Sequence, residues 1–85
     1  MQHETTLPGF ADLHALAEAV GDLRYDALSD FLGALKEKLA RDSAADLGRG
    51  RPKLATSLSD AATAVADAQR GIDEAWRLSR PKMGL

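Results

Sequence analysis

Apolar and small residues recur between Pro52 and Arg80 at alternating steps of four and three, the most regular pattern in the chain. This spacing is typical of a helix that packs along its length against another helix. Large residues alternate with alanines, and the alanines let a partner helix come close. The positions of this stripe are Leu54, Leu58, Ala61, Val65, Ala68, Ile72, Ala75 and Ser79. The pattern predicts one long helix over residues 52–80.

A second apolar stripe precedes it and predicts a helix over residues 23–47. Its positions are Tyr25, Leu28, Leu32, Leu35 and Leu39, with Phe31 widening the stripe. Gly33 interrupts this segment, and a glycine within a helix costs about 1 kcal/mol relative to alanine. We therefore expect a close helix crossing at Gly33.

A shorter helix is predicted over residues 8–20. Pro8 suits the first helical turn, and the apolar residues that follow at helical spacing are Phe10, Leu13, Leu16, Ala17 and Val20. Gly21 fits the left-handed position that closes a helix, and Asp22 can cap the next helix.

Glycines and prolines mark the remaining breaks. Residues 48–51 form the predicted turn between the two long helices, with Gly48 as the C-terminal cap and Pro52 as the first residue of the next helix. Pro81 ends that helix, because its ring disfavours helical geometry in the residue before it, and leaves a tail over residues 81–85. We expect one small helical domain over residues 1–85.

These elements predict an all-α fold, an antiparallel helical hairpin with a short leading helix. A chain of 85 residues buries only about 60–65% of its unfolded surface, so a single core of this size is marginal. The hairpin also leaves an apolar groove that the short leading helix cannot cover. We therefore expect two copies to dimerise into a four-helix-type bundle.

Composition and charge narrow the class of protein. The chain has no cysteine, which excludes disulfides and thiolate metal sites. Neither a long apolar run nor a signal-peptide pattern is present, so a cytoplasmic protein without membrane contact is expected. The net charge is only −2, but residues 1–35 carry six acidic residues against one arginine, while residues 36–53 carry six basic residues against three acidic ones. Such asymmetry can orient a second copy or another partner.

Patterns for catalysis and metal binding are missing from the sequence. The Glu-x-x-His pairs of di-iron helical bundles do not occur. His14 and Glu18 lie four residues apart on one helix face, but two ligands do not make a metal site. We predict that the chain is not an enzyme and has no cofactor.

Two features of the last helix are candidates for an interaction surface. Trp76 flanks the stripe near the end of the helix, where it either anchors the core or contacts another protein. The acidic residues Asp60, Asp67 and Glu74 repeat every seven residues beside the stripe. They form either a solvated side of the helix or one that orients a partner.

The predicted turn carries the sequence Arg49-Gly50-Arg51-Pro52, followed by Lys53. It resembles the core of an AT-hook, in which two arginines on an extended backbone lie in the narrow minor groove of A/T-rich DNA. The resemblance implies nucleic-acid contact by Arg49, Arg51 and Lys53. Glycine and proline are also what a turn between helices needs, and we favour the turn.

The favoured function is a non-enzymatic protein–protein interaction or adaptor module that acts as a homo-oligomer and also binds another protein. In this hypothesis the dimer and core stripe consists of Leu28, Leu32, Leu35, Leu39, Leu58, Ala61, Val65, Ala68, Ile72 and Ala75. The alternative is a nucleic-acid-associated bundle that uses the turn from Arg49 to Lys53. A small enzyme or ligand carrier would need converging polar groups between the helices, of which the sequence offers few.

Overall fold

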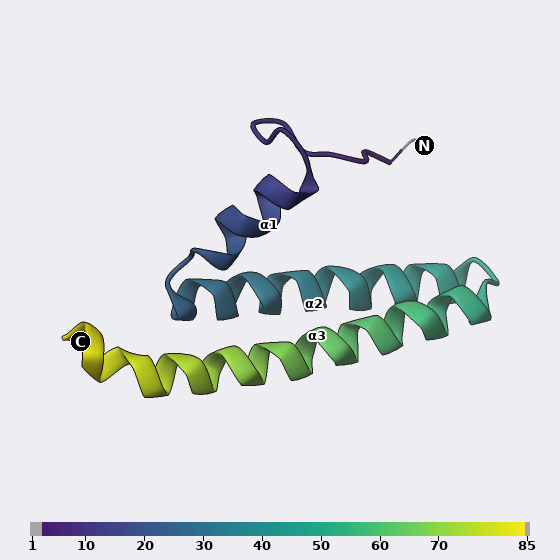
Figure 1. Cartoon of the computed structure of the whole chain (residues 1–85). Helices are drawn as coiled ribbons and strands as arrows, with labels where there is room; N and C mark the ends of the chain where they lie inside the picture. The colour runs from purple at the N-terminus through teal and green to yellow at the C-terminus, as the bar shows by residue number, and fades with distance from the viewer. Residues whose placement is uncertain (1–2, 85) are drawn as a thin grey trace.

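Helices account for every regular element in residues 3–84, the part of the chain that the computed structural model describes (Figure 1). In order along the chain they are α1 (Leu13–Gly21), α2 (Tyr25–Gly48), α3 (Pro52–Ser79) and a short 3-10 helix, η1 (Arg80–Met83). The predicted all-α class is therefore confirmed for these residues. None of the described helices is long and apolar enough to cross a lipid bilayer.

Helix α1 begins at Leu13 rather than at Pro8, because two local signals outweigh the apolar spacing. Asp12 is the N-cap and accepts a hydrogen bond from the Ala15 N–H at 2.8 Å, which satisfies one of the free donors of the first turn. Pro8 and Gly9 lie in a tight turn before the helix, with Gly9 at φ +89°. A proline followed by a glycine at positive φ is typical of a type II turn.

The connection between α1 and α2 also differs from the expected one. Gly21 is the last residue of α1 and not a left-handed cap, and Asp22 closes α1 by donating its backbone N–H to carbonyls of the last turn. The N-cap of α2 is Arg24, which makes no side-chain capping bond. Asp26 lies in the first turn of α2 and accepts a hydrogen bond from the Ala27 N–H at 2.9 Å. A carboxylate at this end of a helix is stabilised by the helix dipole.

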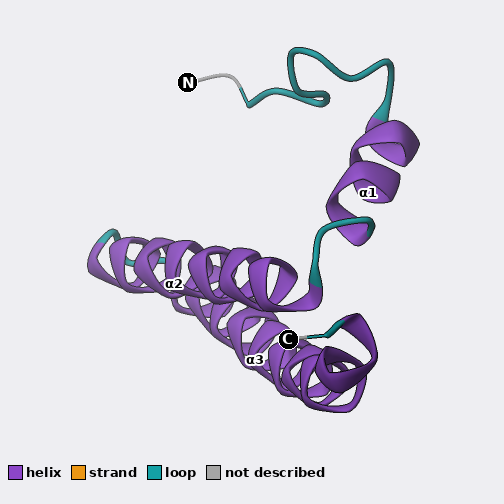
Figure 2. Ribbon diagram, turned by 90° about the vertical axis from the view of Figure 1, so that its left-hand side faces the viewer, coloured by secondary structure: helices purple, strands orange, loops and turns teal. Residues whose placement is uncertain are grey.

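Helices α2 and α3 form an antiparallel hairpin and pack against each other along their length (Figures 1 and 2). We call the turn between them the tip and the opposite end the open end. Near the tip, the Ser43 hydroxyl donates to the Ala55 carbonyl at 2.6 Å. Near the open end, the Ser29 hydroxyl donates to the Asp73 carboxylate. Polar side chains thus bridge the helices at both ends of the hairpin.

The side of α3 that packs against α2 is rotated around the helix axis relative to the predicted stripe. The rotation is about half of the angle between two successive residues. The inward positions are Ala55, Leu58, Ala62, Val65, Gln69, Ile72, Trp76 and Ser79. Ala55 and Ala62 are buried at 5% and 7% exposure, whereas Ala61 and Ala68 of the predicted stripe are exposed. Small residues do allow the close approach, but they lie one position after the expected alanines.

The mid-helix glycine of α2 is explained by a contact with α3. The Gln69 side chain crosses from α3 and donates its Nε2 hydrogen to the Ser29 carbonyl at 3.0 Å. A Cβ atom on Gly33 would lie 2.7 Å from the same Nε2 atom. The space that Gly33 leaves is therefore filled by an amide side chain of α3, and a close crossing of the two helices at this point stays a prediction.

We expect Gly33→Ala to change the free energy of unfolding little in the natural sequence but to raise it by about 1 kcal/mol when Gln69 is also replaced by alanine. In the natural sequence, the gain in helix propensity is offset because the new methyl group displaces the amide and breaks a hydrogen bond worth about 1 kcal/mol. Chemical denaturation of the four chains in this cycle measures the coupling. Equal effects of Gly33→Ala in both backgrounds would rule out the contact.

Helix α1 stands apart from the hairpin on its α2 side (Figures 1 and 2), and the chain before it leads to His3, which lines a hollow together with Lys38 and Asp42 of α2. In the described chain, α1 makes at most slight contact with the other helices. The radius of gyration is 15.6 Å, compared with about 12 Å for a compact domain of this length. The hairpin therefore remains a pair of helices without a second layer over it.

Candidate functional site

One side of the hairpin presents apolar residues from both long helices, and we call it the apolar face. Its members are Leu28, Phe31, Leu35 and Leu39 of α2 with Leu54, Leu58, Ala61, Val65, Ala68, Ile72 and Ala75 of α3. Phe31, Leu35 and Leu54 are 43%, 38% and 45% exposed, although each is a large apolar side chain. An apolar surface of this extent is typical of a binding surface.

One hollow lined by both long helices shows that the two stripes lie on the same side of the hairpin. Lys38 and Asp42 of α2 line one hollow together with Leu54 and Leu58 of α3. Phe31 and Leu35 precede Lys38 and Asp42 by seven residues, and residues one heptad apart lie on the same side of a helix. The exposed apolar residues of α2 and α3 therefore lie on the same side of the hairpin, which near the tip also carries the Lys38–Asp42 ion pair and the two arginines of the turn.

The opposite side of the hairpin is polar. A shallow hollow there is lined by Lys36, Glu37 and Ala40 of α2 and by Ser59, Ala62, Thr63, Ala66, Asp67 and Arg70 of α3. The ion pair between Asp67 and Arg70 lies on this side, and because both side chains are exposed it contributes little to stability. In the described part of the chain, no large apolar side chain lines this hollow, whereas the apolar face exposes Phe31, Leu35 and Leu54.

The accessible surface area of the chain is larger than that of a compact monomer of the same mass. It amounts to 6431 Å², whereas a compact monomer of 9.1 kDa exposes about 4,900 Å². Among the described residues, none of the side chains is completely buried, and the buried apolar residues are two alanines. The chain thus exposes roughly 1,500 Å² more surface than a globular protein of the same size.

The residues of the predicted dimer and core stripe divide between this face and the α2–α3 contact. Leu28, Leu32, Leu39, Leu58, Val65, Ile72 and Ala75 are half-buried, while Leu35, Ala61 and Ala68 are exposed. Their burial between α2 and α3 is thus partial at best. Coverage of the exposed members by a second copy stays a prediction.

The tip is a hydrogen-bonded turn in which Gly50, and not Gly48, adopts the left-handed conformation, at φ +75°. The Arg51 N–H donates to the Asp46 carbonyl at 2.9 Å, and the Gly50 N–H donates to the Leu47 carbonyl at 3.1 Å. These two bonds define a Schellman motif, whose left-handed position is one that glycine occupies without strain. Gly48 is the last helical residue of α2.

Gly50→Ala is expected to lower the free energy of unfolding by about 1 kcal/mol, because a side chain at positive φ is strained. Gly48→Ala is expected to raise it by up to about 1 kcal/mol, because the position is helical and a methyl group gains helix propensity there. A Cβ atom on Gly48 would have no neighbour within 4 Å. Thermal or urea unfolding of the two variants compares the positions, and a loss at Gly48 as large as at Gly50 would contradict the assigned turn.

The two arginines of the tip converge on one buried carboxylate. Their Nη1 atoms lie 3.5 Å (Arg49) and 3.4 Å (Arg51) from Oδ1 of Asp46, whose residue is only 7% exposed. The guanidinium groups themselves stay largely exposed, as does Lys53. The backbone from Arg49 to Arg51 is folded into the turn and not extended as in an AT-hook. No pattern in the sequence marks Asp46 as the group that organises this turn.

At the open end, Trp76 is half-buried and lies beneath Arg24, whose guanidinium carbon is 5.3 Å from the ring centroid. Arg24 also donates two hydrogen bonds to Asp26, at 2.7 and 2.8 Å. This hydrogen bonding lowers the pKa of Asp26 below its ordinary value. The contact therefore stabilises the folded chain above the ordinary pKa of an aspartate and is lost as the pH falls through the lowered one.

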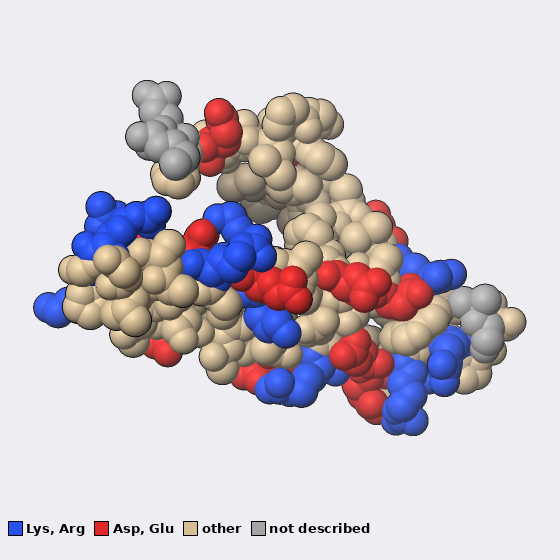
Figure 3. All heavy atoms as spheres, turned by 180° about the vertical axis from the view of Figure 1, so that it is seen from behind, with Lys and Arg blue, Asp and Glu red and all other residues tan. Residues whose placement is uncertain are grey.

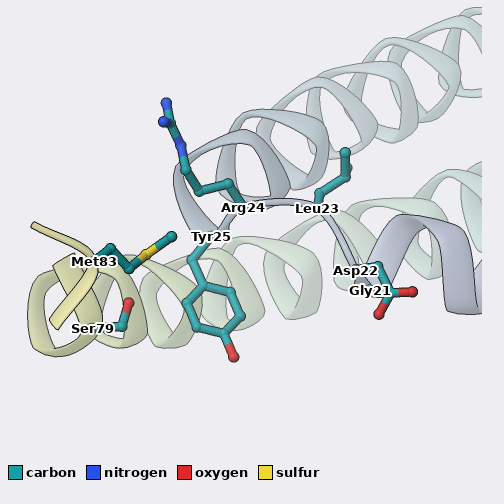
Figure 4. A pocket seen from close by; sticks show the side chains of 7 residues that line it. All are labelled: Gly21, Asp22, Leu23, Arg24, Tyr25, Ser79 and Met83. Carbon is teal, nitrogen blue, oxygen red and sulfur yellow. The ribbon is translucent and has the colours of Figure 1, made fainter. Parts of the chain in front are cut away.

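A shallow hollow beside these residues opens to solvent where α1, α2 and η1 meet (Figure 4). It is lined by Gly21, Asp22, Leu23, Arg24, Tyr25, Ser79 and Met83. The Arg24 side chain points out of it (Figure 4). The hollow is a junction between elements, and its few polar groups do not converge on one point.

The predicted acidic residues lie on exposed positions of α3. Asp67 pairs with Arg70, and Glu74 accepts hydrogen bonds from Arg77 at 2.5 and 2.9 Å. The hydrogen bonds from Arg77 lower the pKa of Glu74. Asp60 is exposed as well. These carboxylates lie on the solvated side of the hairpin, away from the apolar face.

Within residues 3–84, no group of three or more histidine, aspartate or glutamate side chains lies close enough together to hold a metal ion. Comparisons of the chain with protein-family models, with curated proteins and with solved structures find no match. The function proposed below therefore rests on the chain's own geometry.

Proposed function

We propose that the chain is a non-enzymatic interaction module that assembles as a homodimer, in which the apolar faces of two hairpins pack together in a four-helix-type bundle. The large apolar side chains that stay exposed on the apolar face carry this proposal, namely Phe31, Leu35 and Leu54 at 38–45%. The surplus surface of about 1,500 Å² belongs partly to this face and partly to α1 and the residues before it. Burial of both parts in a pair of chains would remove up to about 3,000 Å² in total, within the range of roughly 2,000–5,000 Å² found for permanent homodimers.

The distribution of residues over the hairpin supports pairing through the apolar face. Domains of helices are normally built from two packed layers, and a second hairpin would supply the layer that α1 does not provide. Such a dimer leaves the side of α3 that carries Asp60, Asp67 and Glu74 in solvent. That charged side is then the surface open to a further protein partner.

Light scattering at micromolar concentration tests the proposal. We expect twice the chain mass of 9.1 kDa, with a melting temperature that rises with protein concentration, because dimerisation stabilises only the folded chain. A monomeric mass with full helicity at these concentrations would overturn the proposal and would mean that α1 folds back over its own hairpin.

A second function, nucleic-acid contact by the tip, is favoured only by the exposure of Arg49 and Arg51. We expect the chain to bind A/T-rich and G/C-rich duplexes equally weakly at low salt, because the turn does not present the extended backbone that a minor-groove hook needs. Fluorescence titration of labelled duplexes measures this, with the double variant Arg49→Gln, Arg51→Gln as the control. A preference for A/T-rich duplex that falls steeply with salt and disappears in the double variant would establish the hook.

A further inference from the structure

The segment before the hairpin is a second apolar element without a partner. We call residues 3–22 the arm. Leu13, Leu16 and Val20 recur on one side of α1, and Leu7 of the preceding segment lines a hollow together with Leu13 and Leu16. Leu7, Phe10 and Leu13 are 49%, 38% and 58% exposed. Burying such a side chain is worth about 1.5–3 kcal/mol, so packing of this side of the arm against another surface is favourable.

The junction with α2 holds α1 away from its own hairpin, while His3 at the start of the arm lines a hollow together with Lys38 and Asp42. Only Asp22, Leu23 and Arg24 separate the two helices, and the Leu23 N–H donates to the Val20 carbonyl at 3.1 Å. Arg24 is fixed by its two bonds to Asp26 and by its stacking on Trp76. A connection this short and this well bonded directs α1 outward. Short connections of this kind favour the exchange of an element between copies of a chain.

The net charge of the arm favours contact with one end of a second copy over the other. Residues 3–22 carry four acidic residues and no lysine or arginine, whereas residues 36–53 at the tip carry six basic residues against three acidic ones. Figure 3 shows Lys and Arg side chains at both ends of the hairpin, with Asp and Glu side chains beside those of the open end and the arm above the hairpin. Opposite net charges attract, and like charges repel, over about 10 Å at 0.1 M salt. An arm therefore favours the tip end of a partner over its open end.

We propose that the two chains of the dimer run in opposite directions and that each arm packs near the partner's tip, against the side of the partner's α2 that carries the partner's Ala45. This inference rests on the proposed dimer and adds its orientation and a second contact. A two-fold axis across the hairpins places α2 over the partner's α2 with the direction reversed. The arm, which leaves the open end on the α2 side, then lies beside the partner's tip.

Cross-linking between singly substituted chains tests this arrangement, since the natural sequence contains no cysteine. One chain, carrying an affinity tag, has Ala17→Cys in the arm. The other has Ala45→Cys near the tip or Ala27→Cys near the open end. All three alanines are exposed. Ala27 and Ala45 lie on the same side of α2, five full turns and about 27 Å apart, so they form a matched pair.

We expect mild oxidation to give a covalent heterodimer of the Ala17→Cys chain with the Ala45→Cys chain and not with the Ala27→Cys chain. Heterodimer with Ala27→Cys alone would overturn the reversed orientation. A dimeric mass by light scattering without heterodimer for either variant would overturn arm packing while leaving the dimer intact. A monomeric mass would overturn the dimer itself, and with it the arm contact.

Discussion

Leu35→Asp is expected to raise the dissociation constant of the proposed dimer by about 10² to 10⁴-fold. Burial of one leucine is worth about 1.5–3 kcal/mol, and a two-fold interface contains the residue twice, so about 3–6 kcal/mol is lost before the cost of burying the carboxylate. Leu35 is 38% exposed in the single chain and lies centrally on the apolar face. Its replacement therefore weakens the dimer more than the hairpin.

Sedimentation equilibrium over a dilution series measures this change, and Ala44→Asp is the matched control. Ala44 is exposed and follows Leu35 by nine residues, which is half a turn around the helix. The control variant places the same carboxylate on the opposite side of α2 and should leave the dissociation constant close to that of the natural chain. Equal dissociation constants for the two variants would mean that the apolar face is not the interface.

Ala62→Leu is expected to lower the free energy of unfolding of the hairpin by about 1–3 kcal/mol. Ala62 is 7% exposed and lies where α3 packs against α2. A larger side chain there forces the two helices apart or takes a strained rotamer, and a well-packed contact cannot absorb the added volume. In a domain of this size, a loss of 1 kcal/mol lowers the melting temperature by about 4–8 °C.

Thermal unfolding followed by circular dichroism checks the effect, with Ala64→Leu as the control. Ala64 is exposed, so leucine has room there and keeps a good helix propensity. Ala68→Leu, on the apolar face, should act on the dimer rather than on the hairpin. If Ala64→Leu and Ala62→Leu were equally destabilising, the α2–α3 contact assigned here would be incorrect.

The positions of the long helices could be predicted closely because their signals are local. Pro52 begins α3, and the heptad pattern runs through it to Ser79. Glycines and a proline at residues 48–52 mark the turn, although its geometry makes Gly50 the left-handed residue. The start of α1 was harder to predict, because Pro8 is compatible with both a first helical turn and a type II turn, and Asp12 decided between them by capping the helix.

The candidate site could be predicted only in part. The stripe from Leu54 to Ala75 lies on the surface that we assign to the partner, while the contact within the chain uses Ala55, Ala62 and Gln69. Leu58, Val65 and Ile72 belong to both the predicted stripe and the contact with α2. The same apolar spacing is therefore compatible with two neighbouring sides of the helix. Periodicity alone cannot separate them, since it reports which residues are apolar and not which neighbour covers them.

The sequence by itself determined the helical class, the hairpin and the two apolar stripes, because helix propensity, turn residues and apolar spacing act over a few residues. Only the tertiary structure decided the rotation of the helices, since that depends on contacts between distant residues: Gln69 reaching over Gly33, Ser29 on Asp73, and Ser43 on Ala55. Buried polar groups must find partners, and one relative rotation satisfies these three together. That rotation is also what turns Phe31, Leu35 and Leu54 outward and leaves the apolar face uncovered.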